Sequence, residues 1–150
     1  MGGHVLKHFL EQAVQLAFEN IERGGRPFGA VLVRDGEVVA TGVNDVAATN
    51  DPTSHAELNA LRAATRKLGT PNLGGAVVYA SGHPCPMCLA AMRMCGVGAV
   101  YFAHSNEDAE PFGLSTAAVY ADLAKPFADQ SMKIELVPLK SDLYERWHRG

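Results

Sequence analysis

Two short segments, about thirty residues apart, carry side chains that can bind a metal ion. The first contains His55 and Glu57, and the second contains Cys85 and Cys88 in the run Pro-Cys-Pro-Met-Cys. One imidazole and two thiolates suit a catalytic zinc site, in which three protein ligands leave the fourth position open for water. Cys95 lies a turn or two beyond Cys88, which is an awkward place from which to close a four-ligand site. The pattern therefore predicts one catalytic zinc per chain, bound by His55, Cys85 and Cys88.

Glu57 is the carboxylate that stands beside this ligand set without being part of it. A carboxylate near metal-activated water can move protons between that water and a substrate. Taken alone, His55 could be a helix-start histidine, and the two cysteines could be a thioredoxin-like redox pair. A redox pair does not need His-x-Glu upstream, whereas His-x-Glu with Pro-Cys-x-x-Cys is typical of zinc-dependent nucleobase deaminases. The sequence thus favours a zinc hydrolase with Glu57 as its catalytic residue.

Length and composition predict one compact domain over residues 1–150, because 47% of the side chains are apolar. The net charge of −3 offers no basic field for nucleic acid. Three cysteines, two of them expected zinc ligands, make no disulfide framework, which indicates a cytoplasmic protein. Residues 1–10 contain no long apolar core, so we expect neither a signal peptide nor a membrane span.

Apolar periodicity predicts the elements that must position these residues. An Asp-Gly pair between two apolar runs predicts a β-hairpin whose strands are covered on both faces. The expected fold class is α/β, a three-layer α/β/α sandwich with a five-stranded mixed sheet. Helices are predicted over residues 4–23, from His55 to Gly69, from near Pro86, over 114–125 and over 141–149. Strands are predicted over residues 30–33, 38–43, 75–80, 97–103 and 134–138.

Both halves of the motif fall at predicted helix starts. His55 and Glu57 lie in the first turn of one helix, where Thr53 or Ser54 can act as the N-cap. Cys85 and Cys88 lie at the start of the next helix, where the helix dipole stabilises thiolates. Two helix N-termini are thus expected to meet at one cation.

Three further residues are candidates for contact with a flat ring. Asn44 follows a strand and can both donate and accept, although Asn is also a common turn residue. Phe28 stands at a strand entrance, where it can stack on a ring or simply belong to the core. His83 lies in the turn that leads into Cys85. All three are expected to line the substrate pocket.

Residues 27–104 resemble the bacterial guanine deaminases of the cytidine deaminase-like fold and, slightly less closely, the tRNA adenosine deaminases. The resemblance implies a zinc-activated water, Glu57 as the proton shuttle, and a homodimer. In the guanine deaminases it also implies exchange of the C-terminal segment between subunits. The matching stretches are Pro27-Phe28-Gly29-Ala30-Val31, Asn44, Asn50-Asp51-Pro52-Thr53, His55-Ala56-Glu57 and Pro84-Cys85-Pro86-Met87-Cys88.

The chain also departs from these families at three places. His83 stands where they usually carry Glu, and Met94 stands where guanine deaminases place a Trp. Guanine deaminases bind the purine through an acidic residue just before their last long helix. The corresponding stretch of this chain, Gly113-Leu114-Ser115-Thr116, contains no acid. Another acid could bind the substrate ring instead, and the candidates are Glu107, Asp108, Glu110 and Glu145.

The expected substrate is a small, free, aminated heterocycle, with guanine, converted to xanthine and ammonia in purine catabolism, as the first choice. The first alternative is a tRNA adenosine deaminase, which would need a basic groove for phosphates. The second is an inactive binding module stabilised by zinc. The presence of Glu57 argues against that module, because a structural zinc does not need this carboxylate.

Overall fold

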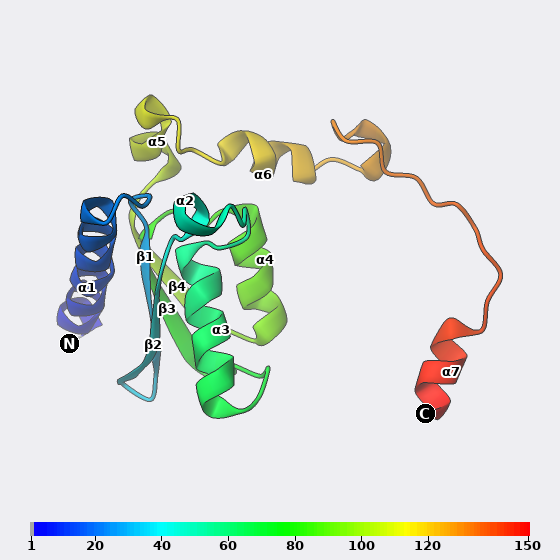
Figure 1. The fold of residues 1–150 in the computed structure, drawn as a ribbon, viewed down its shortest axis with the longest axis horizontal. Helices are drawn as coiled ribbons and strands as arrows, with labels where there is room; N and C mark the ends of the chain where they lie inside the picture. The colour runs from blue at the N-terminus through cyan, green and yellow to red at the C-terminus, as the bar shows by residue number, and fades with distance from the viewer. Residues whose placement is uncertain (1) are drawn as a thin grey trace. The chain divides into compact units, whose positions relative to one another are not determined.

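The computed structural model describes residues 2–150, which fall into two compact units. The first unit extends to Ala117 and the second spans Ala118–Gly150. That residues 1–150 form a single domain remains a prediction from the sequence. The helices of the first unit are α1 (Gly2–Glu22), α2 (Val46–Thr49), α3 (Ala56–Leu68), α4 (Pro86–Cys95), α5 (Asn106–Ala109) and the 3-10 helix η1 (Glu110–Phe112). Its strands are β1 (Gly29–Arg34), β2 (Glu37–Val43), β3 (Ala76–Gly82) and β4 (Ala99–His104) (Figure 1).

The four strands form one mixed sheet in the order β2-β1-β3-β4. β1 is antiparallel to both neighbours, whereas β3 and β4 are parallel. The hairpin between β1 and β2 turns at Asp35 and Gly36, both with positive φ, as the Asp-Gly pair predicts. The parallel step from β3 to β4 runs through α4 and brings the carboxyl ends of both strands to the same edge of the sheet.

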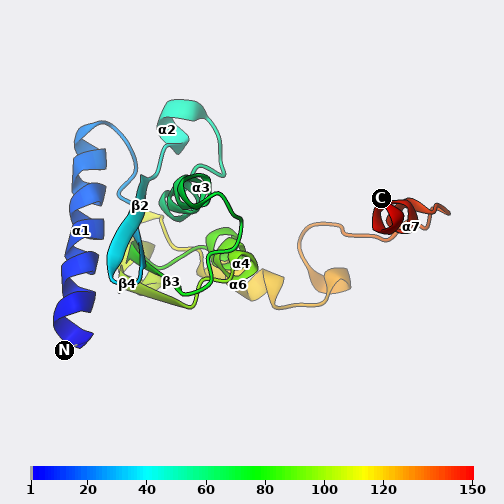
Figure 2. The same ribbon diagram turned by 90° about the horizontal axis from the view of Figure 1, so that it is seen from below.

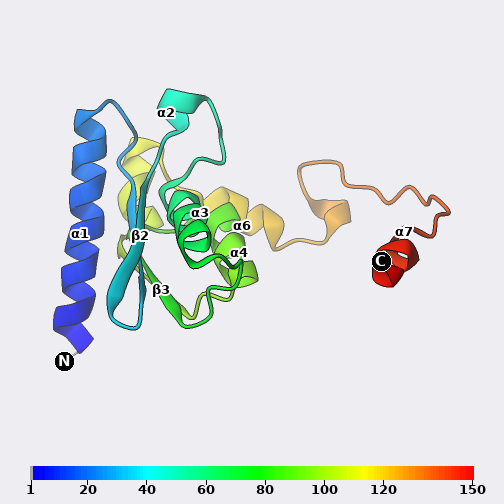
Figure 3. The same cartoon turned by 60° about the horizontal axis from the view of Figure 1, so that its bottom comes forward.

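Helices cover both faces of the sheet, so the predicted α/β architecture with helices on either side is confirmed. Figure 1 shows α1 on one side and α3 with α4 on the other, and Figures 2 and 3 show the same layers from other directions. β1 is buried on both faces: Val31 and Val33 pack toward α1, whereas Ala30 and Leu32 belong to the core under α3 and α4. An uninterrupted apolar strand is what this two-sided burial requires.

Two glycines allow the helices to lie very close to the sheet. A Cβ at Gly29 would collide with the backbone of α1 at Ala13, and a Cβ at Gly42 would collide with the backbone of α3 at Ala56. Ala56 lies next to His55 and Glu57. The depth at which α3 packs on β2 therefore sets the position of the motif at its start.

The prediction of a fifth strand over residues 134–138 is wrong, because the described sheet has four strands. The second unit contains most of α6 (Ala117–Leu123), the 3-10 helix η2 (Phe127–Asp129) and α7 (Leu143–Arg149), joined by segments without regular structure. Leu136 and Val137 are 87% and 76% exposed. The apolar residues of this stretch, including the β-branched Ile134 and Val137, favour a strand, but a strand forms only where a neighbouring strand accepts its hydrogen bonds.

Candidate functional site

The start of α3 places His55 and Glu57 together. His55 is the N-cap residue of α3 with extended backbone angles (φ −82°, ψ 156°), and Glu57 lies in the first helical turn. The expectation that Thr53 or Ser54 caps this helix is therefore wrong. The His55 side chain makes no capping hydrogen bond, which leaves its ring free to face α4.

The start of α4 places the two cysteines in the same way. Cys85 is the N-cap residue, Pro86 follows at the first helical position, and the Cys85 sulfur accepts a hydrogen bond from the Cys88 backbone N–H at 3.4 Å. Proline suits this position because its missing N–H would have no helical partner there. Cys88 is buried and Cys85 is half-buried.

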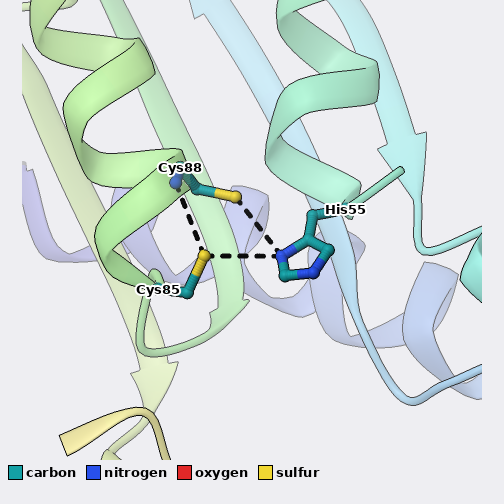
Figure 4. Close-up of side chains that lie close together, drawn as sticks. All are labelled: His55, Cys85 and Cys88. Carbon is teal, nitrogen blue, oxygen red and sulfur yellow. Dashed lines mark hydrogen bonds between the residues drawn. The ribbon is translucent and has the colours of Figure 1, made fainter. Parts of the chain in front are cut away.

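The three side chains meet between the two helix starts (Figure 4). The Nδ1 atom of His55 lies 3.4 Å from the Cys85 sulfur and 3.5 Å from the Cys88 sulfur. A tetrahedral zinc with ordinary Zn–N and Zn–S bond lengths would hold nitrogen and sulfur about 3.6 Å apart. The spacing and chemistry of these donors therefore fit zinc.

No fourth ligand joins this group among residues 2–150. His55, Cys85 and Cys88 form a set of possible metal donors that all lie within 4.8 Å of one another, and neither Cys95 nor Glu57 belongs to it. Cys95 ends α4, three turns from the motif's start, and is half-buried beside the core. Three protein donors leave one tetrahedral position for water, as in catalytic zinc sites.

In the metal-free chain the pKa values of the two cysteine thiols are shifted in opposite directions. The hydrogen bond between their side chains lowers the pKa of Cys85 to about 4 and raises the pKa of Cys88. The hydrogen bond with Cys85 raises the pKa of His55, while burial and the charge of Arg26 act in the opposite direction. Zinc binding would displace the remaining protons, because the metal-bound forms are thiolates and neutral imidazole.

Glu57 is a buried carboxyl group next to the metal donors. It is 7% exposed, and burial raises its pKa to about 7. A carboxyl group with such a pKa exchanges its proton readily near neutral pH, which is what a general acid and base must do.

A cavity of about 200 Å³ opens onto this group, which is enough room for a small flat ring. The sequence-predicted residues Asn44, Phe28 and His83 all line it, together with His55, Glu57 and Cys85. Its remaining lining residues are Arg26, Gly113, Leu114, Ser115 and Thr116. The structure thus brings together every site residue that the motif and its surroundings predict.

Asn44 lines this cavity and has a hydrogen-bond donor that the fold leaves unused. It is 2% exposed, and its Oδ1 accepts a hydrogen bond from the Val46 backbone N–H at 3.0 Å. Its Nδ2 group has no acceptor among the described residues. His83 is positioned differently: its backbone N–H donates to the His104 carbonyl, and its ring packs 4.8 Å from the Phe102 ring, measured between centroids.

Arg26 lines the cavity although the sequence did not single it out. The stretch 113–116, where the resemblance to guanine deaminases implies a substrate contact, lines the cavity as well. The candidate acids Glu107, Asp108 and Glu110 do not line the cavity. Asp108 instead forms a capping box with Ser105 at the start of α5. Met94, at the position of a tryptophan in guanine deaminases, is 88% exposed and also lies outside the cavity lining.

Asn20 is a further residue of the site, in the helix predicted over residues 4–23, that no sequence motif marked out. It is 3% exposed near the end of α1, and its Nδ2 donates to the carbonyls of Arg26 and Asn44, both at 2.8 Å. One buried side chain therefore holds the backbone of two cavity residues. The available signal was a polar residue three positions after Ala17 on the apolar stripe of α1.

Comparison with known proteins agrees with this geometry. Residues 4–104 match the family model of the cytidine and deoxycytidylate deaminase zinc-binding region. The chain is 39% identical over 142 residues to guanine deaminase from Bacillus subtilis, covering 93% of this chain and 91% of that protein. It is 34% identical over 134 residues to tRNA-specific adenosine deaminase from Aquifex aeolicus, covering 89% and 86%.

Solved structures give the same picture. The X-ray structure of guanine deaminase from Bacillus subtilis has a TM-score of 0.89 and 38% identity, covering 96% of this chain and 94% of that one. A guanine deaminase from Nitrosomonas europaea has a TM-score of 0.69 and 29% identity, covering 72% of this chain and 63% of that one.

Within residues 2–150, no helix has the length and apolar character needed to cross a membrane.

Proposed function

We propose that this chain, which belongs to the family defined by the cytidine and deoxycytidylate deaminase zinc-binding region, removes the amino group of a free heterocycle by hydrolysis, with guanine as its substrate. The observation that carries the proposal is the cavity lined by Glu57 and by the zinc donors His55 and Cys85, with the third donor, Cys88, directly behind them. Guanine and water would give xanthine and ammonia. The likeness to guanine deaminase supports guanine, because it reaches 39% identity over 93% of this chain, against 34% over 89% for the tRNA-specific adenosine deaminase.

We assign the zinc to His55, Cys85 and Cys88. Bound there, zinc supplies a water acidic enough to lose a proton near neutral pH. Glu57 would accept that proton and pass it to the ring nitrogen next to the amine-bearing carbon. It would then take the remaining proton of the added hydroxyl and give it to the departing amine, so that ammonia leaves and a carbonyl remains. Each such transfer contributes roughly 10²–10⁴-fold to the rate.

Asn44 and Phe28 orient the ring in this scheme. The Nδ2 group of Asn44 donates to a ring nitrogen or carbonyl, since its oxygen is already occupied by Val46. Phe28 and His83 line the cavity and provide flat surfaces along which an aromatic ring can lie. These contacts favour a single flat ring system over a bulky polymer.

The protein is further proposed to act as a cytoplasmic homodimer. Apolar side chains of the second unit are exposed in the single chain, including Leu139 at 90% and Trp147 at 80%. Apolar surface of this kind is normally covered by a partner. Exchange of the segment 118–150 between two copies would cover it, as the resemblance to guanine deaminases implies.

A substrate screen tests the proposed reaction. Zinc-loaded protein is given guanine, other purines, pyrimidines and triazines, and a tRNA anticodon stem-loop, and ammonia is measured at low and moderate salt. We expect ammonia from guanine at a rate that changes little with salt, because no phosphates are neutralised. Turnover of the stem-loop alone, with a steep loss between low and moderate salt, would assign the chain to the tRNA branch. No turnover of any compound would support an inactive zinc-stabilised module.

A further inference from the structure

Three hydrogen-bonding groups in the cavity wall are left unused by the fold. The Arg26 guanidinium makes no ion pair within the described part of the chain, and the Asn44 Nδ2 group has no acceptor there. The Oγ1 atom of Thr116 is buried and has no hydrogen-bond partner in the same residues. A buried polar atom is normally paired, so Thr116 Oγ1 is free to bind a ligand, and the Arg26 and Asn44 groups offer further donors beside it.

The unused groups are mostly donors. A guanidinium and an amide NH₂ can only donate, and a threonine hydroxyl can donate or accept. Ser115 adds a second hydroxyl whose oxygen already accepts from the Ala117 N–H at 3.2 Å. Among the cavity lining residues, Glu57 is the carboxylate, and its role in proton transfer is already assigned. The wall is therefore complementary to a ring rich in acceptor atoms.

Arg26 is held at this wall by α1. Its carbonyl accepts hydrogen bonds from Asn20 Nδ2 and from the Phe28 N–H, both at 2.8 Å. Asn20 also binds the Asn44 carbonyl, which fixes the spacing between the two donor residues. The Arg26 side chain is exposed yet borders the cavity, so it stands at the cavity mouth.

We infer that Arg26 is a specificity-determining residue, whose guanidinium donates to a carbonyl oxygen on the substrate ring and so selects oxo-bearing amino-heterocycles over those that lack the oxygen. The inference rests on the proposed deamination of a free ring and names the feature of the ring that is selected. Guanine meets the requirement, because its carbonyl oxygen lies two ring bonds from the carbon that bears the amine. An arginine suits this role, since it stays charged and presents several donors in a fixed plane.

A comparison of guanine with 2-aminopurine distinguishes loss of the Arg26 contact from loss of catalysis. 2-Aminopurine carries the same amine on the same ring as guanine but lacks the carbonyl. Arg26→Met keeps the length of the side chain and removes its charge, Arg26→Lys keeps the charge and loses the planar donors, and Arg23→Met is the matched control. Arg23 is also exposed near the end of α1, but it does not line the cavity. Zinc content and circular dichroism confirm that each variant folds.

For Arg26→Met we expect kcat/KM on guanine to fall about 10- to 100-fold, the range for loss of a charged hydrogen bond. The value on 2-aminopurine should change by less than about threefold, Arg26→Lys should be intermediate, and Arg23→Met should match the parent. An unchanged preference for guanine over 2-aminopurine in Arg26→Met would overturn the inference and leave the deaminase assignment intact.

Binding provides a readout that does not depend on turnover. Calorimetry compares xanthine, which carries carbonyls and no amine, with unsubstituted purine on the zinc-loaded parent and Arg26→Met. We expect the variant to lose about tenfold or more in affinity for xanthine and little for purine. If the parent releases ammonia from no ring, the proposed function fails, and the xanthine comparison still decides the role of Arg26. The assigned role of Arg26 would be overturned if parent and variant bound xanthine with equal affinity, or if the parent did not bind xanthine.

Discussion

At the residue scale, the site is built from residues that cap helices. His55 precedes α3 and Cys85 precedes α4, so each has extended backbone angles and lies just outside its helix. A side chain at this position can face across to the neighbouring helix start, which places His55 Nδ1 3.4 Å from the Cys85 sulfur. Cys88 completes the set from one turn further along α4. Local helix-start chemistry thus produces a metal site across two helices.

Cysteine substitution tests this ligand set. Cys88→Ser should lose most of its zinc and unfold at lower temperature, because bound metal stabilises the folded state by mass action. Cys95→Ser should retain zinc, since Cys95 lies outside the donor group. Elemental analysis with thermal melts measures both. Zinc retained in Cys88→Ser, or lost in Cys95→Ser, would contradict the assignment.

The motif could be read from sequence because metal geometry restricts residue type and spacing over short distances. The roles of Arg26 and Asn20 could not, because tertiary packing alone brings these two residues to the cavity wall. Asn44 and Phe28 lie between these cases. Their residue types suit a binding role, but the hydrogen bond from Val46 that makes Asn44 a donor is visible only in the structure.

At the element scale, the depth of α3 on the sheet sets the site. Gly42 in β2 lies against the α3 backbone at Ala56, directly beside the His-x-Glu motif. A larger residue at position 42 must push α3 outward and move His55 and Glu57 away from α4. Packing between α3 and β2, a strand that itself contains no metal ligand, therefore controls the position of the ligand at the start of α3.

Gly42→Ala should consequently reduce both stability and zinc affinity. Overpacking costs about 1–3 kcal/mol, which lowers the melting temperature by roughly 2–12 °C for a chain of this size. Gly98→Ala is the control, because its Cβ would lie an ordinary 3.6 Å from the Ala76 carbonyl oxygen. Melting curves and competition with a zinc chelator provide the measurements. Equal behaviour of the two variants would show that α3 can shift without cost.

The elements themselves were largely predictable, apart from the strand expected over residues 134–138. The periodic apolar faces of α1 and α3 and the Asp-Gly hairpin depend on local sequence. A fifth strand depends on a partner with free backbone groups, which residue pattern alone cannot supply. The same limit explains why the exposed segment around Leu136 has strand-like composition without strand structure.

At the scale of the whole molecule, the exposed apolar residues of the second unit predict a dimer. Analytical ultracentrifugation should give a mass of about twice the 16.0 kDa of one chain. Combined Leu136→Glu and Leu139→Glu substitutions should shift the protein toward monomer, because they place charges in the proposed contact. Lys140→Glu, at an exposed neighbouring position, should leave the dimer intact. A parent protein that sediments as a monomer at all concentrations would contradict the prediction.

Product formation from guanine tests the proposed deamination and the role of Glu57 in a single assay. Xanthine and ammonia are measured together for zinc-loaded parent protein and for Glu57→Gln with matched zinc content. We predict equal amounts of the two products from the parent, and turnover at least about 10²-fold slower in Glu57→Gln, which keeps the shape of the side chain but cannot accept the proton. No xanthine from the zinc-loaded parent, or parental turnover in Glu57→Gln, would contradict the account.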